Sequence, residues 1–486
     1  MPHPPETYAA IEQVSSPAWS RDGKRIHYLR GSGMQAAWSR DLATGADTKL
    51  TDHDEKVALI RRAPTDERIA YGIDRGGDER QQLWLLEPGA PARALTDDPA
   101  VIHDWGGWSP DGRSVVVAAN DRDEAHFDLL EIDAATGARR RLREGRGIVA
   151  AAGYRADGAR IAALEDRGHC DMTLLVLDAA TGEVAARFEE PGSAQFQSVR
   201  WASDKRTLLA LTTLGGSDML RLCRLDPDTG GCEVVHEAPG REVDGWAASP
   251  DGATLATLEN DRGWSVLRVG PAGGDRRVVD LPPCVVGDLA FSPDGAALAF
   301  SVSAPERPGS IWIWRGGRAA PEIEIAPAVA DFAPWELVEW ESFDGWRIPG
   351  WLVLPPGAPP AGGHRAIVWV HGGPVGQTRP NFRPDIQMLV SQGYAVLLPS
   401  VRGSAGYGRA WAESDDGGKR LDCVRDMLLG RDWLAAHPAI DGARIAIMGQ
   451  SYGGYMVNAA LTEAPQAWKA AVNYYGIYDF ASTLRD

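Results

Sequence analysis

Seven copies of one short pattern, spaced 43 to 47 residues apart, constrain the fold of this 486-residue chain more than any other feature. The pattern is an aromatic residue, replaced by Arg62 in the second copy and by Ala248 in the sixth, then Ser-Pro-Asp-Gly or a variant of it, then a run rich in β-branched or leucine side chains. An apolar residue follows the aspartate position by four residues in every copy: Ile26, Ile69, Val115, Ile161, Leu208, Leu255 and Leu298. A period of this size indicates a repeat architecture in which each unit buries its apolar face against its neighbours.

Within each copy the residue types predict four strands. Pro-Asp-Gly favours a tight turn, because proline fixes φ and glycine accepts a positive φ. In the third copy, residues 114–119 suit a buried strand and residues 128–133 suit the next one. A second turn and a more polar fourth strand complete the unit. The sequence therefore predicts an all-β, seven-bladed propeller over residues 1–328. The repeats lack the Trp-Asp dipeptide of the WD type and resemble the TolB-type repeat.

The first and last copies each contain a full set of strands, which bears on how the ring closes. The first copy supplies its own inner strand at residues 8–19, and the seventh keeps its own outer strand at residues 322–326. No strand then needs to be exchanged between the first and last blades. We therefore expect an open seam that is held only by side-chain packing.

The pattern changes near residues 325–334, where the chain becomes rich in alanine and proline and the repeat stops. Beyond this point strand-like segments alternate with helical ones. Strands are predicted at residues 336–342, 348–354, 366–371, 394–399, 444–448 and 469–475, with helices at 419–436 and from 452 onward. This alternation is typical of a mostly parallel sheet covered by helices, so we predict an α/β domain at residues 329–486.

The segment Gly449-Gln-Ser451-Tyr-Gly453 contains the motif that carries chemistry. It reads Gly-x-Ser-x-Gly between a predicted strand and a predicted helix, which is the context of a nucleophile elbow. The sharp turn needs small flanking residues, and it projects the Ser451 Oγ at the N-terminus of a helix, where developing negative charge is favoured. Ser451 is thus the candidate nucleophile. The alternative is a glycine-rich turn with a solvated serine.

Upstream, a predicted strand ends in His371-Gly-Gly-Pro374. In an α/β hydrolase sheet, the loop after this strand offers backbone N–H groups to an oxyanion, together with the N–H that follows the nucleophile. The second of these donors is Tyr452. Because proline has no N–H, the first is Gly372 or Gly373, and we favour Gly373; the alternative is a plain turn. We do not assign His371 as the general base, since it precedes the serine and belongs to the oxyanion loop, which it is expected to order.

The order of these motifs resembles that of the prolyl oligopeptidase family, above all its acylaminoacyl-peptidase and dipeptidyl-aminopeptidase branch. The shared features are the propeller repeats, His-Gly-Gly-Pro, Arg402-Gly-Ser-Ala-Gly-Tyr-Gly408 and Gly-Gln-Ser-Tyr-Gly-Gly-Tyr, and they span nearly the whole chain. The resemblance implies an α/β-hydrolase domain and a serine peptidase that acts on short peptides, with the propeller excluding folded proteins. It also implies the nucleophile and oxyanion-hole roles given above, and no metal or organic cofactor.

Two further segments match features of that family. The loop at residues 402–408 corresponds to a family loop, which we expect to be structural rather than catalytic. Asp78 and Glu79 in the second blade resemble the acidic anchors that hold a peptide amino terminus in some relatives. A solvated hairpin turn is the better interpretation of these two residues, because they lie in Asp-Arg-Gly-Gly-Asp-Glu.

The rest of a catalytic triad is not found where the fold would place it. In this fold the serine is followed by an acid and then a histidine. No histidine follows Ser451; the last is His437. The acidic residues beyond Glu463 are Asp479 and Asp486, and Asp479 comes too early in the fold for the family's acid. We therefore expect an incomplete hydrolase domain, a C-terminally truncated sequence and an inactive fragment. The alternatives are a propeller-based binding protein with a vestigial hydrolase domain, or a carboxylesterase.

Charge and composition exclude several classes of partner. The net charge is −17, and residues 1–331 hold 37 basic against 52 acidic residues, which argues against nucleic acid or an anionic membrane surface. This acidic propeller either attracts cationic peptides or only improves solubility. No run of 18 apolar residues predicts a membrane span, and the N-terminus lacks the features of a signal peptide. We expect a cytoplasmic protein; the sequence does not indicate its oligomeric state.

The five cysteines are scattered: Cys170, Cys223, Cys232, Cys284 and Cys423. An odd and dispersed set in a long chain predicts reduced thiols rather than a disulfide framework. Cys223 and Cys232 flank a turn and face each other across a predicted hairpin, so a disulfide there is the alternative. No Cys or His spacing predicts a metal site.

Overall fold

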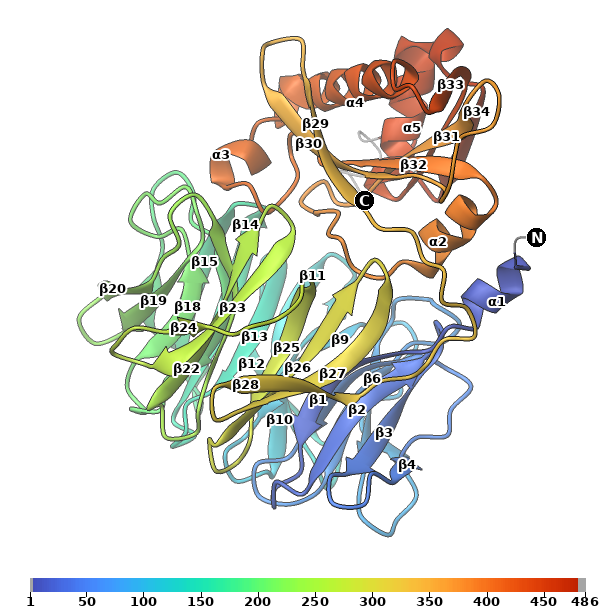
Figure 1. Cartoon of the computed structure of the whole chain (residues 1–486). Coiled ribbons are helices and arrows are strands. Elements are labelled where there is room, and N and C mark those ends of the chain that lie inside the picture. The colour runs from blue at the N-terminus through green and yellow to red at the C-terminus, as the bar shows by residue number, and fades with distance from the viewer. Residues whose placement is uncertain (1–2, 480–486) are drawn as a thin grey trace.

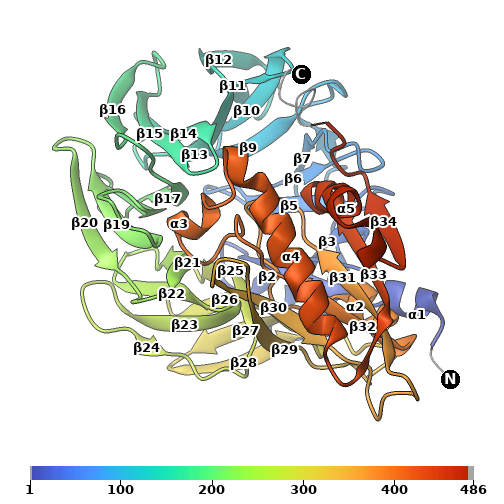
Figure 2. The ribbon, with the colours of Figure 1, turned by 90° about the horizontal axis from the view of Figure 1, so that it is seen from above.

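The computed structural model describes residues 3–479 and consists of a ring of β-sheets with an α/β domain over one end of it (Figure 1). Seen from above, helix α4 (Arg420–Ala435) crosses over the ring (Figure 2). The first helix, α1 (Pro5–Ala9), packs on α2 (Pro384–Ser391) of the α/β domain, where Tyr8 joins an apolar cluster with Phe332 and Phe382. No helix within residues 3–479 is long and apolar enough to cross a bilayer.

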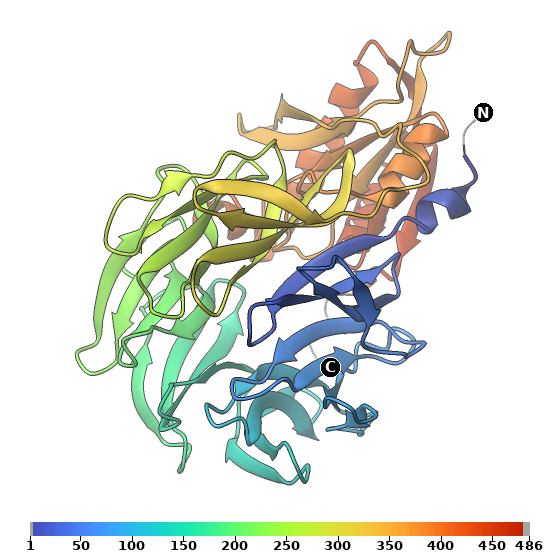
Figure 3. The ribbon, with the colours of Figure 1, turned by 60° about the horizontal axis from the view of Figure 1, so that its bottom comes forward.

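Residues 13–323 form seven antiparallel sheets of four strands each, which confirms the seven-bladed β-propeller (Figure 3). The first three blades are β1 (Gln13–Trp19), β2 (Arg25–Gly31), β3 (Gln35–Asp41) and β4 (Asp47–Lys49); β5 (Val57–Arg62), β6 (Ile69–Ile73), β7 (Gln82–Leu86) and β8 (Arg93–Ala94); β9 (His103–Trp108), β10 (Ser114–Asp123), β11 (His126–Asp133) and β12 (Arg139–Arg143). The fourth and fifth are β13 (Ile148–Tyr154), β14 (Arg160–Gly168), β15 (Asp171–Asp178) and β16 (Val184–Phe188); β17 (Phe196–Trp201), β18 (Leu208–Thr212), β19 (Arg221–Asp226) and β20 (Gly231–His236). The last two are β21 (Glu242–Ala248), β22 (Thr254–Asp261), β23 (Trp264–Pro271) and β24 (Arg277–Val278); β25 (Val285–Phe291), β26 (Ala297–Ala304), β27 (Arg307–Arg315) and β28 (Arg318–Ile323).

The repeated sequence pattern has a structural explanation in each blade. The aromatic position pairs directly with the apolar anchor of the next strand, as Trp108 does with Val115. Between them, the Ser109 Oγ donates a hydrogen bond of 2.7 Å to Asp111, and Gly112 adopts a φ of +69°, so the turn closes on itself. Tryptophan indoles at the aromatic position also join blades: Trp108 Nε1 donates to the Arg61 carbonyl of the preceding blade at 3.1 Å. The pattern therefore specifies both the turn and the contact between blades.

The ring closes without strand exchange, as predicted, because the first and seventh blades are each built from consecutive strands. Side chains of β1 and β2 pack against those of β26 and β27, with Ile26 and Ile311 fully buried. Packing alone was the wrong expectation, since hydrogen bonds also cross the seam. The Trp19 Nε1 donates to the Ala290 carbonyl at 2.9 Å, and the Ser16 N–H donates to the Asp288 carboxylate at 3.1 Å.

Two strand boundaries in these terminal blades differ from the prediction. The inner strand of the first blade starts at Gln13 rather than at residue 8, because the proline-rich start forms α1. The outer strand of the seventh blade is β28, not residues 322–326. Pro321 lies inside this edge strand, where a missing N–H is tolerated, so a pattern that treats proline as a strand breaker places the strand too late.

The α/β domain is a six-stranded sheet with the order β29-β30-β32-β31-β33-β34, in which β32, β31, β33 and β34 are parallel. Its strands are β29 (Glu336–Glu341), β30 (Arg347–Val353), β31 (His364–Val370), β32 (Tyr394–Pro399), β33 (Ile440–Gln450) and β34 (Ala470–Tyr474). α4 and α5 (Tyr452–Glu463) cover one face and α2 covers the other, while α3 (Arg409–Ala412) and 3-10 turns at Gly417–Lys419 and Pro465–Ala467 lie in connections. Each predicted strand and helix of this domain is present, and among the described residues β34 forms one edge of the sheet. The boundary at residue 328 remains a proposal; it falls between β28 and β29.

Loops of the α/β domain dock on blades five and six. The Arg379 guanidinium donates to the Asp244 carboxylate at 2.5 Å and to the Gly263 carbonyl at 2.8 Å. The Asp218 carboxylate accepts the Ala410 N–H at 2.7 Å. Glu242 lies buried in the same interface, and burial raises the pKa of its carboxyl to about 7, helped by the nearby negative charges of Asp244 and Asp218.

We expect this buried carboxyl to make the protein less stable as the pH rises from about 4.5 to about 7. The folded protein holds the Glu242 proton more tightly than the unfolded chain does. The contribution of this carboxyl to the free energy of unfolding is therefore fully present below pH 4.5, the pKa in the unfolded chain, and it is lost as the pH rises to about 7, the pKa in the folded protein. The loss is on the order of 2–3 kcal/mol. Urea unfolding at pH 5 and pH 7.5 measures it. Glu242→Gln should remove this part of the pH dependence, whereas Glu233→Gln, at an exposed site on β20, should not; equal pH dependence in all three proteins would contradict the prediction.

Candidate active site

Ser451 stands at a strained turn between β33 and α5. Its φ of +53° and ψ of −122° lie in a region that residues with a side chain rarely adopt. The flanking glycines make the turn possible: a Cβ on Gly449 would lie 2.2 Å from the Gly453 carbonyl oxygen, and one on Gly453 would lie 2.3 Å from the Val370 carbonyl oxygen. The serine itself is exposed at the start of the helix. This geometry is that of a nucleophile elbow.

The predicted oxyanion loop lies against this serine. A Cβ on Gly372 would be 3.5 Å from the Ser451 Cβ, so the start of the loop lies close to the serine. Gly373 follows with a φ of +141°, a conformation that favours glycine, and the Gly373–Pro374 bond is cis. Tyr452 is the first residue of α5, so its amide lies at the positive end of the helix dipole. The fold thus brings the four predicted site residues to one place.

The Tyr452 side chain anchors the start of α5 to a polar group that the sequence did not reveal. Its hydroxyl donates to the Asp415 carboxylate at 2.9 Å, and the Arg420 guanidinium contacts the same carboxylate at 2.6 Å. Asp415 is fully buried, and burial raises the pKa of its carboxyl. The Cys423 Sγ lies 3.4 Å from the same hydroxyl, and burial raises the pKa of this thiol to about 12. Asp415 and Arg420 therefore position the residue next to the nucleophile.

We predict that Tyr452→Phe lowers the free energy of unfolding by about 1–3 kcal/mol, because it removes a hydrogen bond to a buried carboxylate. Urea unfolding followed by fluorescence measures the change. Tyr478→Phe is a matched control, since this tyrosine is 81% exposed and its hydroxyl loss should cost nothing measurable. A Tyr452→Phe protein as stable as this control would show that the contact with Asp415 does not hold the helix.

Comparisons with known proteins agree with this geometry. The model of the prolyl oligopeptidase family matches residues 380–486, which include the elbow. Through these residues, the chain is similar to the prolyl oligopeptidase family. It is 26% identical to dipeptidyl aminopeptidase BIII of Pseudoxanthomonas mexicana, over 94% of this chain and 69% of that protein. It is 24% identical to an uncharacterized peptidase, YuxL, of Bacillus subtilis, over 97% of this chain and 82% of that protein.

Solved structures show the same fold. A prolyl endopeptidase structure superposes with a TM-score of 0.84 at 18% identity, over 98% of this chain and 75% of that one. The C-terminal domain is therefore the α/β-hydrolase region of the family, and the ring is its propeller. By family resemblance the chain is an enzyme of the serine peptidase class. Within residues 3–479, no three His, Cys, Asp or Glu side chains are grouped as they would be around a metal ion.

His371, which precedes the predicted oxyanion glycines, forms no hydrogen bond with Ser451. One ring nitrogen lies 2.7 Å from the Gly372 carbonyl oxygen, and the other lies 3.0 Å from the Ser404 Oγ. Desolvation lowers the pKa of the imidazole, so the neutral ring is favoured at pH 7. This supports a role in ordering the loop. None of the ten histidines, all within the described residues, hydrogen-bonds to the Ser451 Oγ.

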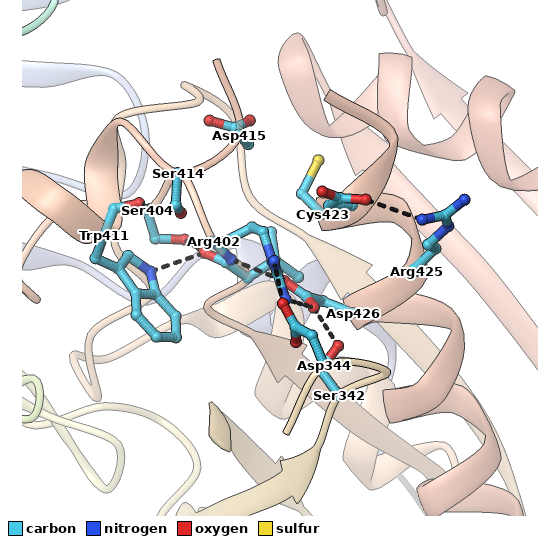
Figure 4. A network of polar contacts seen from close by, with 12 residues as sticks. Ser342, Asp344, Arg402, Ser404, Trp411, Ser414, Asp415, Cys423, Arg425 and Asp426 are labelled. Atoms are coloured by element: carbon cyan, nitrogen blue, oxygen red, sulfur yellow. Dashed lines mark hydrogen bonds and ion pairs between the residues drawn. The ribbon is translucent and has the colours of Figure 1, made fainter. Parts of the chain in front are cut away.

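The family loop at residues 402–408 is built around a buried ion-pair network (Figure 4). The Arg402 guanidinium contacts the Asp426 carboxylate at 2.8 and 2.9 Å and the Asp344 carboxylate at 2.9 and 3.0 Å. The Ser342 Oγ donates to Asp426 at 2.5 Å in the same network. Desolvation opposes the charge of Arg402, but the hydrogen bonds and negative charges of Asp344 and Asp426 raise its pKa. The sequence singled out Arg402 but neither aspartate. A signal existed for Asp426, which interrupts the apolar face of α4 next to Met427.

The acidic residues of the second blade lie where a turn was expected. Asp78 and Glu79 are exposed between β6 and β7. The Asp78 carboxylate accepts the backbone N–H groups of Arg75 and Arg80 at 3.2 and 3.0 Å, so it closes its own turn. This arrangement supports the solvated-turn interpretation over an anchor for a peptide amino terminus.

Proposed function

We propose that the chain carries the nucleophile and oxyanion hole of a serine peptidase that hydrolyses short peptides. The observation that carries the proposal is the strained Ser451 on a glycine-lined elbow, with Gly372 of the predicted oxyanion loop close to it. The Ser451 Oγ attacks the scissile carbonyl carbon, and the oxygen of the tetrahedral intermediate accepts the N–H groups of Tyr452 and Gly373. Loss of the amine leaves an acyl-enzyme on Ser451, which water then hydrolyses.

The substrate class follows from the domain arrangement. The domain that bears Ser451 lies over one end of the propeller (Figure 1). This arrangement supports short peptides, rather than folded proteins, as substrates. Aminopeptidase, acylaminoacyl-peptidase and oligopeptidase activities are all compatible with this arrangement. The dipeptidyl aminopeptidase from Pseudoxanthomonas mexicana, which aligns along most of the chain, supports release of dipeptides. We also propose a cytoplasmic location, since all five cysteines are free thiols.

This mechanism needs a base for the serine proton. A histidine, oriented by a carboxylate, takes the proton from Oγ and later gives it to the leaving amine. Since none of the histidines in this sequence bonds to the Ser451 Oγ, we expect hydrolysis only where a histidine from outside these 486 residues reaches it.

The test uses the protein purified from its natural source. Its intact mass is compared with 52.3 kDa, and its turnover of dipeptide anilides, acyl-amino-acid anilides, short peptides and simple esters is measured. A fluorophosphonate probe should modify Ser451, located by mass spectrometry, and the protein should cleave peptides. Turnover of esters without peptides would instead identify a carboxylesterase. A protein with neither labelling nor turnover would be a binding protein with a vestigial hydrolase domain.

A further inference from the structure

One position of the propeller repeat departs from its pattern in two blades. The position in question is the residue just before the aromatic position, on the inner strand of each blade. In all seven blades it pairs with the residue that follows the apolar anchor, as Arg61 pairs with Ala70. It is alanine or glycine in five blades and arginine in blades two and five: Ala18, Arg61, Gly107, Gly153, Arg200, Ala247 and Ala290. Five small residues show that the fold does not need a long side chain here. The two arginines therefore need another explanation.

Both arginines line the central channel of the propeller. The channel is a cavity of about 1240 Å³, lined by Arg379 of the α/β domain and, in the propeller turns, by Pro250 and Pro293. Arg61 and Arg200 have side chains exposed to this cavity. The backbone that carries Arg61 is fixed, since its carbonyl accepts the Trp108 indole N–H. The two side chains thus enter the channel from rigid strands of two different blades.

The charges of these two guanidinium groups are poorly compensated. Desolvation by the surrounding blades lowers the pKa of both, and the positive charge of Arg61 lowers that of Arg200 further. Within residues 3–479 neither forms an ion pair: Arg61 donates to the Ile60 carbonyl at 2.9 Å, and the Arg200 guanidinium lies 5.5 Å from the centre of the Trp246 ring. Two like charges therefore line one cavity, and among the described residues neither has an acidic partner within hydrogen-bond distance.

The acidic groups of the channel are engaged elsewhere. Asp244 is paired with Arg379 at 2.5 Å. Asp288 lies close enough to favour the charge of Arg61, but one oxygen of its carboxylate already accepts the Ser16 N–H at 3.1 Å and the Ser301 hydroxyl at 2.8 Å. The channel therefore retains positive charge although residues 1–331 are strongly acidic overall. An anion in the channel would relieve the repulsion between the two arginines.

We propose that Arg61 and Arg200 form a binding site for a carboxylate group inside the propeller channel. A guanidinium presents parallel N–H donors that match the two oxygens of a carboxylate, and the confined channel strengthens such a contact relative to bulk water. The carboxylate comes either from the C-terminus of a peptide that occupies the channel or from a small free dicarboxylate.

Binding is measured by calorimetry on the full 486-residue chain carrying Ser451→Ala, so that no turnover interferes. The probes are an N-acetylated alanine-glycine pentapeptide with a free C-terminal carboxylate, the same peptide as its C-terminal amide, and succinate. We expect the free acid to bind at least about tenfold more tightly than the amide, and Arg61→Ala or Arg200→Ala to abolish this preference. Arg-dependent binding of succinate, without a preference between the two peptides, would assign the same site to small free anions.

The variants are chosen so that misfolding does not obscure the result. Alanine is the residue that three other blades carry at this position, and removal of one like charge should leave the melting temperature unchanged or raise it. Arg277→Ala, at an exposed position on β24, is the matched control and should bind like the parent. The proposal is overturned if none of the probes binds, or if binding persists unchanged in Arg61→Ala and Arg200→Ala. Because no hydrolysis is measured, this outcome is independent of the proposed peptidase activity.

Discussion

Replacing Arg402 with methionine should lower the free energy of unfolding of the α/β domain by about 3–5 kcal/mol. The guanidinium is 5% exposed and holds two carboxylates, one of which, on Asp426, is fully buried. Methionine keeps the length of the side chain but leaves the Asp426 charge without its cation. A buried charge that loses its partner destabilises the fold by more than the intact ion pair stabilises it. We therefore expect this substitution to lower the free energy of unfolding by more than the loss of a typical hydrogen bond would.

Guanidinium-induced unfolding of the full chain, followed by tryptophan fluorescence, measures this loss. The matched control is Arg425→Met, next to Asp426 on α4. The Arg425 side chain, which pairs with Asp422, is 59% exposed, so its loss should cost at most about 1 kcal/mol. A second variant, Arg402→Met with Asp426→Leu, removes both buried charges and should recover part of the stability. If Arg402→Met is no more destabilising than the control, the network does not support the domain in the way proposed.

The parts of the fold that were predictable from sequence depend on local patterns. The pairing of Trp108 with Val115 across one turn is set within eight residues, and the same pattern recurs in each blade. The elbow at Ser451 is likewise local, because its two glycines and its strand–helix context lie within a short segment. Local physical chemistry fixes such features, so one sequence is enough to find them.

Contacts between distant segments were not predictable in the same way. Arg402 meets Asp344 from 58 residues before it and Asp426 from 24 residues after it, and nothing in either local sequence specifies the partner. Tyr452 on α5 and Asp415, in the turn after α3, meet in the same way from 37 residues apart. The channel arginines are an intermediate case, since the repeat aligns Arg61 with Arg200 but only closure of the ring brings them into one cavity. Sequence reasoning thus singled out Ser451 as the candidate nucleophile, but it missed Asp415, Asp426 and Asp344, which contact the residues around it.

We expect the 486-residue chain on its own to hydrolyse short peptides no faster than its Ser451→Ala variant. Removing a triad member typically costs about 10⁴ to 10⁶ in kcat. Ser451 is held in an elbow, but its hydroxyl has no base among the histidines of this sequence, and the nearby His371 contacts Gly372 and Ser404 instead. Dipeptide anilide hydrolysis, followed over long incubations, compares the two proteins; circular dichroism and the melting temperature verify that both are folded.

The prediction is that the two proteins have equal rates, not that either rate is zero. An oxyanion hole alone still accelerates hydrolysis by about 10³ to 10⁴ over water, so both proteins can retain some turnover. That residual catalysis needs the N–H groups of Tyr452 and Gly373 but not the serine hydroxyl, so Ser451→Ala should leave it intact. Turnover that depends on Ser451 would show that a base within the chain reaches its Oγ. His371 would then be the first candidate, and His371→Ala would have to abolish that turnover. The Ser451 hydroxyl and the oxyanion loop thus have separable effects on the rate, and only the first requires a histidine.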